Sequence, residues 1–349
     1  MKRRLFACLL AGCMMLSLFP AVSAASTGYA DVPATSWAAA DIAAATEAGL
    51  FQGVSANTFG MGKTMTRAQF VTALVRLFGW ETVTPATPTF SDCAAWRWYY
   101  GAVETAYAHD ALPSYSTTFR PNDAVTREEM ASMLVRALGY TALAGQLASR
   151  SLPFSDVTSN KGYIAIAYDL GIITGYADGT FRPKGLATWE QVAAVLVRLM
   201  KKLQTSSMEV SGGSYISLEV EIPQASADTT VPTTPPQATL DLYEALRICQ
   251  EKGTDMSRVA VVFTAGGVST VTRGSSIVST QEVSRRQVDN YLSRSGVKNY
   301  YSDKYDCSYL IYTSGSTQTT IWYQTEESLS AKLALCRLFG VTHYIMQDA

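Results

Sequence analysis

The stretch "MTRAQFVTALVRLFG" at residues 65–79 decides the fold of the first half of this chain, because the sequence repeats it. Related stretches are "VTREEMASMLVRALG" at 125–139 and "ATWEQVAAVLVRLM" at 187–200. In each stretch a Thr stands three residues before a Gln or Glu, which is the spacing of a capping box at a helix start. The apolar residues that follow recur at helical spacing, so one face of each helix is predicted to be buried. The pairs are Thr66 with Gln69, Thr126 with Glu129, and Thr188 with Gln191.

Each capped helix closes a longer unit, and the units recur with a period of about 60 residues. The units open with "YADVPATSW" at residue 29, "FSDCAAWRW" at residue 90 and "FSDVTSNKG" at residue 154. An Ala-rich helical stretch and a turn-rich loop with one Phe then lead to the capped helix. One such unit has little apolar surface, so we expect the three to pack around a shared core.

The first helical position after each cap carries Arg67, Arg127 or Trp189. The helix dipole favours an anion at this end, so an Arg here works against it, and its planar fork of donors fits a carboxylate. We therefore interpret Arg67 and Arg127 as ligands of an external anion, with a carboxylate of the protein itself as the competing explanation. Trp189 predicts that the third repeat lacks one such site.

The openings of the repeats supply further candidate ligand residues. Asp31 and Asp92 can accept hydrogen bonds from sugar hydroxyls, and Trp37 and Trp98 can stack on a sugar ring. The alternatives are that the aspartates order the turn and that the tryptophans pack against the fold. In the third repeat Asp156 is kept, but Gly162 stands where the other two repeats have Trp.

The order of these features resembles the S-layer homology family: an aromatic-x-Asp opening, a Trp, a loop such as "GYADGTFRP" at 175–183 and a capped "TRAE"-like helix. The resemblance covers residues 29–203 and implies a pseudo-threefold helical bundle. It also implies noncovalent attachment to a secondary cell-wall polysaccharide that often bears pyruvate ketals. Sites in this family are shared by neighbouring repeats, so Gly175 and Asp178 are candidates to complete a site whose charge comes from another repeat.

The composition changes after the third repeat. A strand "SYISLEVEIP" is predicted at 214–223, and the Thr- and Pro-rich "QASADTTVPTTPPQAT" at 224–239 predicts an extended linker. The chain is thus predicted to be multidomain, with a mainly α three-repeat part followed by a small α/β domain. The predicted segments are a signal peptide at 1–24, repeats at 29–80, 90–140 and 154–203, a joint at 204–239 and the α/β domain at 240–349.

Helical and strand patterns alternate in residues 240–349. Helices are predicted at 242–253, 281–292 and 326–340, the second opened by a capping box at Ser279 and Glu282, and strands at 258–265, 308–314, 317–324 and 341–346. The segment from Thr320 to Gln347 resembles the closing strand-helix-strand of family 18 glycoside hydrolases.

The resemblance to these hydrolases does not extend to their acid motif, because no DxxDxDxE sequence occurs in the chain. A whole barrel of this kind also needs about 250 residues. No catalytic residue is assigned, and Asp303, Asp306, Glu326 and Glu327 are interpreted as surface acids near a helix start. The domain is instead a candidate for binding a glycan or a protein partner.

The first residues, "MKRRLFACLLAGCMMLSLFPAVSAAS", predict a secretory signal peptide with cleavage near Ala24 or Ala25. Lipidation at Cys13 is the alternative, because Leu10 to Cys13 resembles a lipobox. Later in the sequence no apolar run reaches the roughly 18 to 20 residues that a membrane span needs. The mature protein is therefore expected to be exported without a transmembrane segment and to associate with the cell wall or S-layer.

The overall composition excludes several function classes. With 48% hydrophobic and 16% charged residues and a net charge of -1, the chain has no electrostatic footprint for nucleic acid. Its two His residues and the absence of a CxxC spacing predict no metal site, no cofactor and no catalytic triad. After signal cleavage the cysteines are Cys93, Cys249, Cys307 and Cys336, and the last three could form one bridge or remain buried thiols.

These observations lead to one principal hypothesis and two alternatives. The principal one is noncovalent anchoring of an exported protein to the wall of a Gram-positive-type bacterium, through an anionic, pyruvylated secondary polysaccharide. The first alternative is a wall-tethered protein similar to glycoside hydrolases that acts on or binds peptidoglycan or a chitin-like glycan. The second is a structural subunit of a surface layer.

Overall fold

The computed structural model describes residues 28–204, 209–210, 215–219 and 238–347. The expected signal peptide, Cys13 and nearly all of the Thr- and Pro-rich segment lie outside the described residues. The chain divides into two units, residues 1–204 and 205–349. Each unit is described by itself.

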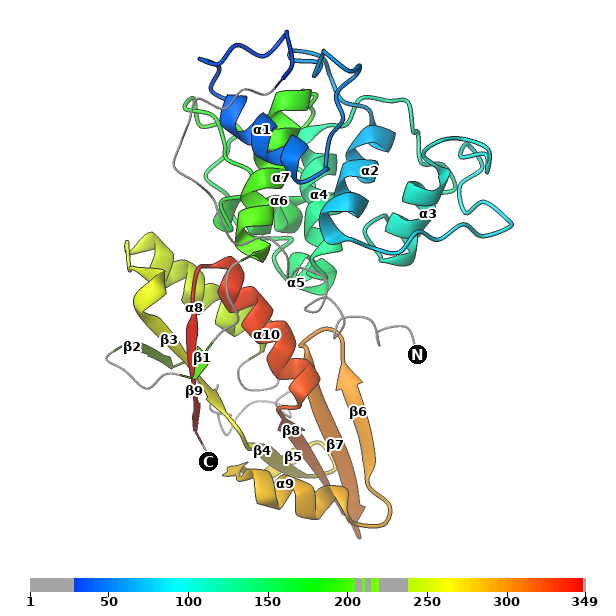
Figure 1. The fold of residues 1–349 in the computed structure, drawn as a ribbon. Helices are drawn as coiled ribbons and strands as arrows, with labels where there is room; N and C mark the ends of the chain where they lie inside the picture. Colours follow the sequence, from blue (N-terminus) through cyan, green and yellow to red (C-terminus); the bar gives the residue numbers. More distant parts are fainter. Residues whose placement is uncertain (1–27, 205–208, 211–214, 220–237, 348–349) are drawn as a thin grey trace. The chain divides into compact units, whose positions relative to one another are not determined.

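The N-terminal unit is built from helices (Figure 1), and each repeat has the predicted pair: one helix after the opening turn and one capped helix. A short additional helix, α5, was not predicted. The helices are α1 (Ala39–Glu47), α2 (Arg67–Phe78), α3 (Tyr100–Ala108), α4 (Arg127–Ala137), α5 (Thr141–Gln146), α6 (Lys161–Asp169) and α7 (Trp189–Leu203).

The predicted caps hold the starts of α2, α4 and α7. The hydroxyl of Thr66 accepts a hydrogen bond from the Gln69 amide at 3.3 Å, and the Gln69 side chain accepts one from the Thr66 amide at 2.9 Å. Thr126 and Glu129 make the same reciprocal pair at 3.3 and 3.0 Å. In the third repeat the Gln191 side chain accepts from the Thr188 amide at 3.2 Å. Each bond satisfies a backbone group that a helix start otherwise leaves free.

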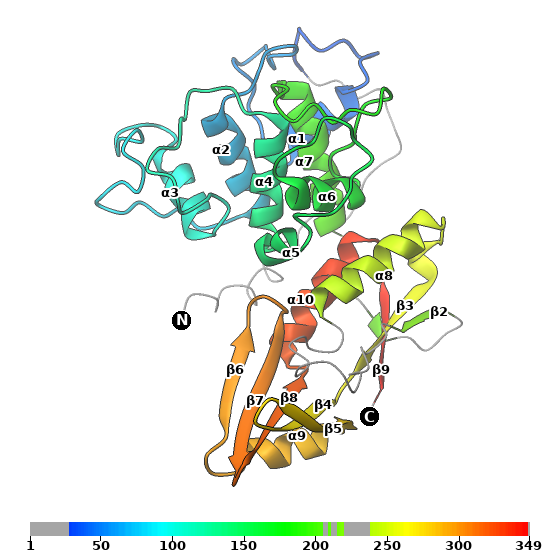
Figure 2. The ribbon, with the colours of Figure 1, turned by 180° about the vertical axis from the view of Figure 1, so that it is seen from behind.

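The three repeats interlock in a cycle. Helix α3 packs against α2, α6 against α4, and α1 against α7, so the first helix of each repeat lies on the capped helix of another repeat (Figure 2). The chain just before the caps closes a ring of backbone hydrogen bonds: Met65 N–H donates to Ala187, Ala187 N–H to Val125, and Val125 N–H to Met65, each at 2.9 Å. Every repeat therefore contacts both others.

The predicted match of Gly162 with the two tryptophans is wrong. Trp37 and Trp98 lie two residues before α1 and α3, whereas Gly162 is the second residue of α6 and matches Ala40 and Gly101. A Cβ at Gly162 would lie 1.8 Å from the carbonyl oxygen of Ala144, because α6 runs directly against α5. Any side chain would push the two helices apart. Gly162 therefore has a packing role beside α5.

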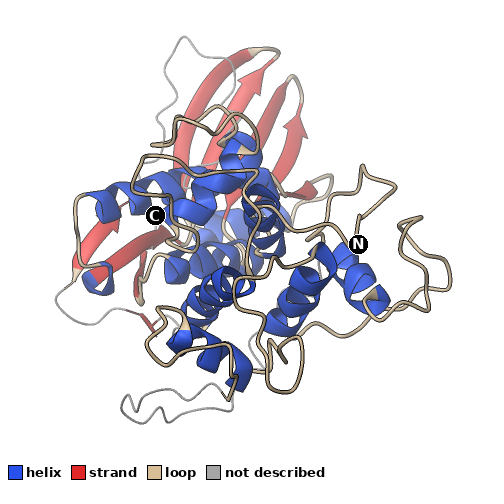
Figure 3. Ribbon diagram, turned by 90° about the horizontal axis from the view of Figure 1, so that it is seen from above, coloured by secondary structure: helices blue, strands red, loops and turns tan. Residues whose placement is uncertain are grey.

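The C-terminal unit contains all the named strands of the described chain, drawn red in Figure 3. A parallel sheet has the order β1-β9-β3-β2, and an antiparallel sheet has the order β5-β4-β8-β7-β6. The strands are β1 (Glu209–Val210), β2 (Ile216–Glu219), β3 (Val259–Thr264), β4 (Gly267–Arg273), β5 (Ser276–Val283), β6 (Lys298–Ser302), β7 (Cys307–Ser314), β8 (Thr317–Tyr323) and β9 (His343–Gln347). The helices are α8 (Thr239–Glu251), α9 (Arg285–Leu292) and α10 (Glu326–Leu338), with a short 3-10 turn at Met256–Arg258.

The strand predicted in the joint belongs to the parallel sheet of this unit. Ile216 pairs with Val259, and the pairing runs along β2 and β3. The unit accordingly begins before residue 240, the start that the sequence predicted, and includes residues from 205 onward.

The predicted capping box at Ser279 and Glu282 is wrong. Both residues lie in β5, where they pair with Val271 and Val268 of β4. The helix starts later, at Arg285, and the Ser284 amide donates to the Gln287 side chain at 2.7 Å. The Ser-x-x-Glu spacing is a local signal, and it is overridden here by the pairing of β5 with β4.

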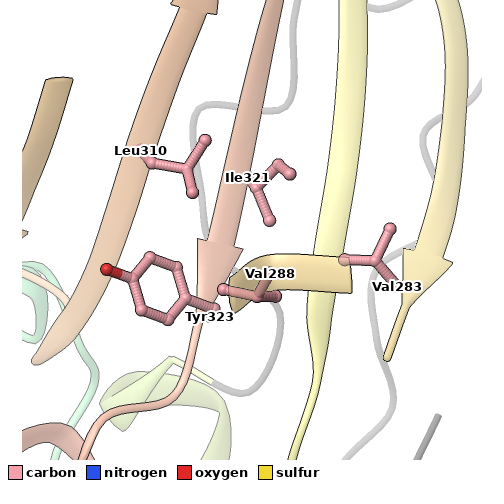
Figure 4. Close-up of a cluster of buried hydrophobic side chains, with 5 residues drawn as sticks. All are labelled: Val283, Val288, Leu310, Ile321 and Tyr323. Carbon is pink, nitrogen blue, oxygen red and sulfur yellow. The ribbon is translucent and has the colours of Figure 1, made fainter. Parts of the chain in front are cut away.

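Helix α9 covers one face of the antiparallel sheet. Its Val288 is buried against side chains from β5, β7 and β8, which Figure 4 shows pointing to the same side. The cluster comprises Val283, Val288, Leu310, Ile321 and Tyr323.

The alternative of a disulfide is wrong, because Cys93, Cys249, Cys307 and Cys336 are all free thiols.

Candidate anion-binding junctions between the repeats

Arg67 reaches from the first repeat into the second. The residue is only 8% exposed, Nε donates to the carbonyl of Phe119 at 2.8 Å, and the guanidinium lies 4.8 Å from the centre of the Phe119 ring. Nη1 lies 2.7 Å from Oε1 of Glu129. We call this set, with Arg120, the Arg67 junction. Arg67 thus pairs with a carboxylate of the protein itself, as the competing interpretation of the sequence predicted.

Arg127 reaches in the same way from the second repeat into the third. It is 7% exposed, Nε donates to the carbonyl of Phe181 at 2.8 Å, and Nη2 donates to that of Thr174 at 2.7 Å. The guanidinium lies 4.8 Å from the ring centre of Phe181 and 4.9 Å from that of Tyr176. Among the described residues no carboxylate forms an ion pair with Arg127. These residues and Arg182 form the Arg127 junction.

The two junctions share one backbone frame. The Arg67 amide donates to Asp123, three residues before the cap Thr126, and the Arg127 amide donates to Gly185, three residues before the cap Thr188, both at 2.9 Å. The next amide in each helix donates to a proline carbonyl, at Pro121 and Pro183 respectively. The side-chain differences between the junctions are therefore comparable position by position.

Trp189 occupies the third junction, between the third repeat and the first. Its amide donates to Lys63, three residues before the cap Thr66, at 3.0 Å. The indole is 7% exposed and packs edge-on against Phe59, with ring centres 5.6 Å apart, and against Phe51 at 5.9 Å. Phe59 corresponds to the rings under Arg67 and Arg127. An apolar ring thus fills the place that a cation takes in the other two junctions.

At the Arg67 junction the capping residue Glu129 pairs with both cations, and Asp123 lies 3.7 Å from Arg120. Oε1 of Glu129 lies 2.7 Å from Arg67 and 2.5 Å from Nη2 of Arg120. Burial acts to raise the pKa of this carboxyl, but the Thr126 amide and the Arg67 guanidinium outweigh it, so the pKa lies below its ordinary value. Glu129 is therefore ionised at neutral pH.

The Arg127 junction lacks this compensation. Helix α7 has the neutral Gln191 at the position of Glu129. Arg182, which matches Arg120 in its left-handed φ (56° and 59°), instead pairs with Asp178 at 2.8 Å and lies over Tyr176. Burial lowers the pKa of Arg127, and the nearby charge of Arg182 lowers it further. A guanidinium nevertheless stays protonated, so Arg127 keeps a charge that carbonyl dipoles, ring faces and the nearby charge of Asp156 offset without an ion pair.

The predicted aspartates brace the fold. The carboxylate of Asp31 accepts bonds from the amides of Phe59, Gly60 and Met61 at 2.7, 2.8 and 2.9 Å. Asp92 and Asp156 accept two amides each from the corresponding loops, at 2.7 and 2.8 Å. The pKa of Asp156 is lowered chiefly by the Phe181 amide. These contacts hold each opening turn against the loop that carries the junction Phe. They agree with the alternative interpretation, in which the aspartates order the turn.

The predicted tryptophans lie at the surface. Trp37 is 63% exposed and Trp98 is 66% exposed, so neither side chain is buried in the core, and Trp98 contacts Tyr99 edge-on at 5.3 Å. The second repeat exposes two further aromatic residues, Trp96 and Tyr115, which the sequence analysis missed. The clustered "WRWYY" at 96–100 was the available signal.

Gly175 and Asp178 flank Tyr176, so the loop that the sequence singled out does lie against Arg127 of another repeat. Gly175 itself has a packing role, because a Cβ there would lie 2.2 Å from the Phe154 ring. Asp178 accepts bonds from Thr180 and Arg182 at 2.6 and 2.8 Å, and its pKa falls to about 2, first because of Thr180. The structure brings Arg127 and this loop together, whereas Arg67 belongs to another junction.

The described parts of the chain contain no group of three or more His, Cys, Asp or Glu side chains placed to hold a metal. No helix in those parts is both long and apolar enough to cross a membrane. Of the acids near α10, Asp306 accepts a bond from the Thr239 hydroxyl at 3.1 Å, and Glu326 and Glu327 lie in the first helical turn.

The solved structures that are similar to this chain include the spore cortex-lytic enzyme SleL of Bacillus cereus. That likeness has a TM-score of 0.33 and 12% identity, and it covers 38% of this chain and 31% of that one. A family GH18 chitinase from Cycas revoluta matches with a TM-score of 0.27 and 13% identity over 33% of this chain and 36% of that one.

Relatives in sequence include an endoglucanase of Bacillus sp. (strain KSM-635), 32% identical over 203 residues, which are 54% of this chain and 21% of that protein. An S-layer protein sap of Bacillus anthracis is 26% identical over 207 residues, 59% of this chain and 25% of that protein. A cell surface glycoprotein 1 of Acetivibrio thermocellus is 31% identical over 165 residues, 43% of this chain and 7% of that protein. The chain spans a quarter or less of these relatives.

The model of the S-layer homology domain matches residues 28–71, 89–131 and 153–193. The three matches coincide with the openings, loops and capped helices described above, and they stop within α2, at the middle of α4 and within α7. Domains of this kind anchor proteins to the cell wall. Residues 28–193 thus carry three S-layer homology domains, and the chain is a secreted protein associated with the cell wall or the S-layer.

Proposed function

We propose that the N-terminal unit anchors this protein noncovalently to a secondary cell-wall polysaccharide, by holding an anionic group of the polymer, such as the carboxylate of a pyruvate ketal, at the Arg127 junction. The observation that carries the proposal is the guanidinium of Arg127, which keeps its charge against two ring faces without a carboxylate partner among the described residues. A carboxylate that bonds such a group makes a charge-assisted contact of about 1.5–3 kcal/mol.

The arrangement of the repeats supports a three-pronged, pseudo-threefold body for this unit. The ring of hydrogen bonds through Met65, Ala187 and Val125 relates the three caps to one another. Each junction then joins two neighbouring repeats. The exposed Trp37 and Trp98 supply apolar surfaces on which sugar rings of the same polymer can stack.

Wall retention tests this function. The chain without residues 1–24 is sedimented with purified wall sacculi before and after chemical removal of the secondary polymer. Retention is expected on intact sacculi and is expected to fall to background on stripped ones. Equal retention on both preparations would contradict the proposal.

A second candidate function, glycan binding by the C-terminal unit, is favoured by an aromatic ladder on the antiparallel sheet. Tyr300, Tyr309 and Trp322 pair directly across β6, β7 and β8. Their ring centres are 5.1 and 4.6 Å apart, at interplanar angles of 21° and 39°. Successive residues of a strand point to opposite faces, so this ladder lies on the face opposite the α9 cluster.

The ladder has the chemistry of a sugar platform. Tyr300 is 41% exposed, and Tyr309 and Trp322 are half-buried, so their rings remain partly accessible. Titration of the full chain with a neutral N-acetylglucosamine tetrasaccharide, followed by tryptophan fluorescence, tests this function. Tyr300→Ala is expected to weaken binding at least fivefold, with Tyr115→Ala, which removes an exposed ring from the other unit, as the matched control. Equal binding by both variants would exclude the ladder as the site.

A further inference from the structure

We propose that the residue at the third position of each capped helix selects which junction accepts an anion. Glu129 closes the Arg67 junction with its own carboxylate, and Gln191 leaves the Arg127 junction open. This inference rests on the proposed function and names the residue that sets where the polymer binds.

The matching frames of the two junctions support the comparison. Both arginines donate their backbone amide to the residue three positions before the next cap, and both donate Nε to the carbonyl seven positions before it, at 2.8 Å. The third residue after that cap is therefore placed alike relative to each guanidinium. At the first junction this residue is Glu129, and at the second it is Gln191.

Glu129 makes the contacts that an external carboxylate would make. It accepts from Arg67 and Arg120, and its side chain is 22% exposed. An anion from outside must displace it and leave a half-buried carboxylate without its partners, which is unfavourable. At the Arg127 junction no such displacement is needed, because Gln191 carries no charge and its oxygen accepts from the Thr188 amide.

The acids nearest to Arg127 are already engaged elsewhere. Asp178 is paired with Arg182 and Thr180, and Asp156 accepts the amides of Phe181 and Arg182. The neighbouring Glu128 is bonded to Ser159 and forms an ion pair with Lys184. Arg127 thus has no ion-pair partner among the described residues, although the charge of Asp156 acts on it from nearby.

The chain itself shows that both residues suit this position. Glu serves in the capping box at 129, and Gln serves at 69 and 191, each accepting from its cap amide. Exchanging the two therefore keeps the cap and changes only the charge. Gln69 follows the cap next to Trp189, where no cation is present, so Gln69→Glu is a matched control.

The experiment uses the chain without residues 1–24 and calorimetric titration with a methyl hexopyranoside that bears a 4,6-pyruvate ketal. The methyl ester of the ketal is the neutral control ligand. We expect one site in the unaltered protein, about tenfold or more weaker binding in Gln191→Glu, a second site in Glu129→Gln and no change in Gln69→Glu. In the double exchange of Glu129→Gln with Gln191→Glu, binding of the ketal is expected to return. In that background Arg67→Met is expected to abolish binding, whereas Arg127→Met is expected to leave it unchanged.

The outcomes separate the two levels of the proposal. If the unaltered protein does not bind the ketal, or binds its ester equally well, the proposed anion-binding function fails. If it binds and Arg127→Met abolishes binding, but Gln191→Glu binds as before and Glu129→Gln gains no site, the function stands and the selection by this residue is refuted. Recovery of binding in the double exchange rules out misfolding as the cause of the loss in Gln191→Glu.

Discussion

The Arg67 and Arg127 junctions share their backbone hydrogen bonds and their stacked Phe ring. Among the described residues, however, only Arg67 forms an ion pair with a carboxylate. The two junctions differ in the capping residue, Glu129 in one and Gln191 in the other, and the Arg127 junction also has Tyr176 and the carbonyl of Thr174. The third junction differs again, because Trp189 fills it with an apolar ring. Repetition of a fold therefore does not imply repetition of a site. The proposed function assigns an anion to the Arg127 junction and not to the other two.

The largest expected effect concerns the filled junction. Trp189→Ala removes a buried indole that packs on Phe59 and Phe51. We expect the free energy of unfolding of the N-terminal unit to fall by about 3–5 kcal/mol, as for other large-to-small core changes. Urea unfolding followed by circular dichroism measures it. A loss below about 1 kcal/mol would mean that the indole does not contribute to this interface between repeats.

The next largest effect distinguishes the two cationic junctions by binding. Arg127→Met is expected to weaken binding of the ketal sugar by about 100-fold, because a charge-assisted contact is lost. Arg67→Met is expected to change it less than threefold, because Glu129 already occupies that guanidinium. Titration calorimetry measures both. Equal losses in the two variants would erase the proposed difference between the junctions.

Stability should reverse that order. Arg67→Met leaves Glu129 half-buried with one partner fewer, and we expect the free energy of unfolding to fall by about 2 kcal/mol. Arg127→Met also frees two carbonyls but removes an uncompensated buried charge, so a smaller loss is expected. Chemical denaturation of the two proteins side by side provides the measurement. A larger loss in Arg127→Met would indicate that its charge is compensated in the folded protein.

A buried lysine in the other unit offers a comparison with Arg127. Lys332 is fully buried, and its Nζ has no hydrogen-bond partner among the described residues. Burial lowers its pKa, so the unfolded chain binds more protons at neutral pH, and the stability of this unit should rise with pH up to the unfolded pKa of about 10.4.

Replacing this lysine tests the linkage. Lys332→Met is expected to raise the free energy of unfolding at pH 7 by about 1–2 kcal/mol and to flatten its rise between pH 7 and 10. Thermal unfolding across that range measures both effects. An unchanged pH slope would show that the ammonium group is retained in the fold, as the guanidinium of Arg127 is.

The smallest effect concerns the aspartates that brace the junction loops. The amides of Phe59, Gly60 and Met61 offset the effect of burial and hold the pKa of Asp31 below its ordinary value. Its contribution to stability is present above the unfolded pKa of about 3.9 and is lost as the pH falls through the lower folded value. Asp31→Asn is expected to lower the free energy of unfolding by about 1 kcal/mol at pH 7 and to have less effect near pH 3. A difference that does not shrink in acid would rule out the carboxylate charge as the cause.

Local signals in the sequence were sufficient for the scaffold of the repeats. Thr66 and Gln69 lie three residues apart, so their capping box is visible in the sequence alone. The partner of Arg67 was not visible in this way. Phe119 and Glu129 lie 52 and 62 residues further along the chain and meet Arg67 only because the repeats interlock.

The residue types of the candidate site could be predicted from the sequence, but their ion pairs and their exposure could not. The sequence showed that Arg67 and Arg127 occupy equivalent positions, and it could not show that only one of them is paired. The exposure of Trp37 and Trp98 likewise depends on which helix packs behind them. In the C-terminal unit β4, β5 and β6 were missed, because the pairing of a strand such as β4 with β8 is a nonlocal contact.

The ring of backbone hydrogen bonds through Met65, Ala187 and Val125 has a consequence for how such proteins can change in evolution. Each hydrogen bond of the ring joins the N–H group of one repeat to the carbonyl of another. Three such bonds use the N–H and the carbonyl of all three residues. A fourth copy could join only if one link opened, and removal of a copy would leave a donor and an acceptor unmatched at the centre. Duplication should therefore add whole triplets, whereas a single repeat can differ without opening the ring, as the repeat with Trp189 does.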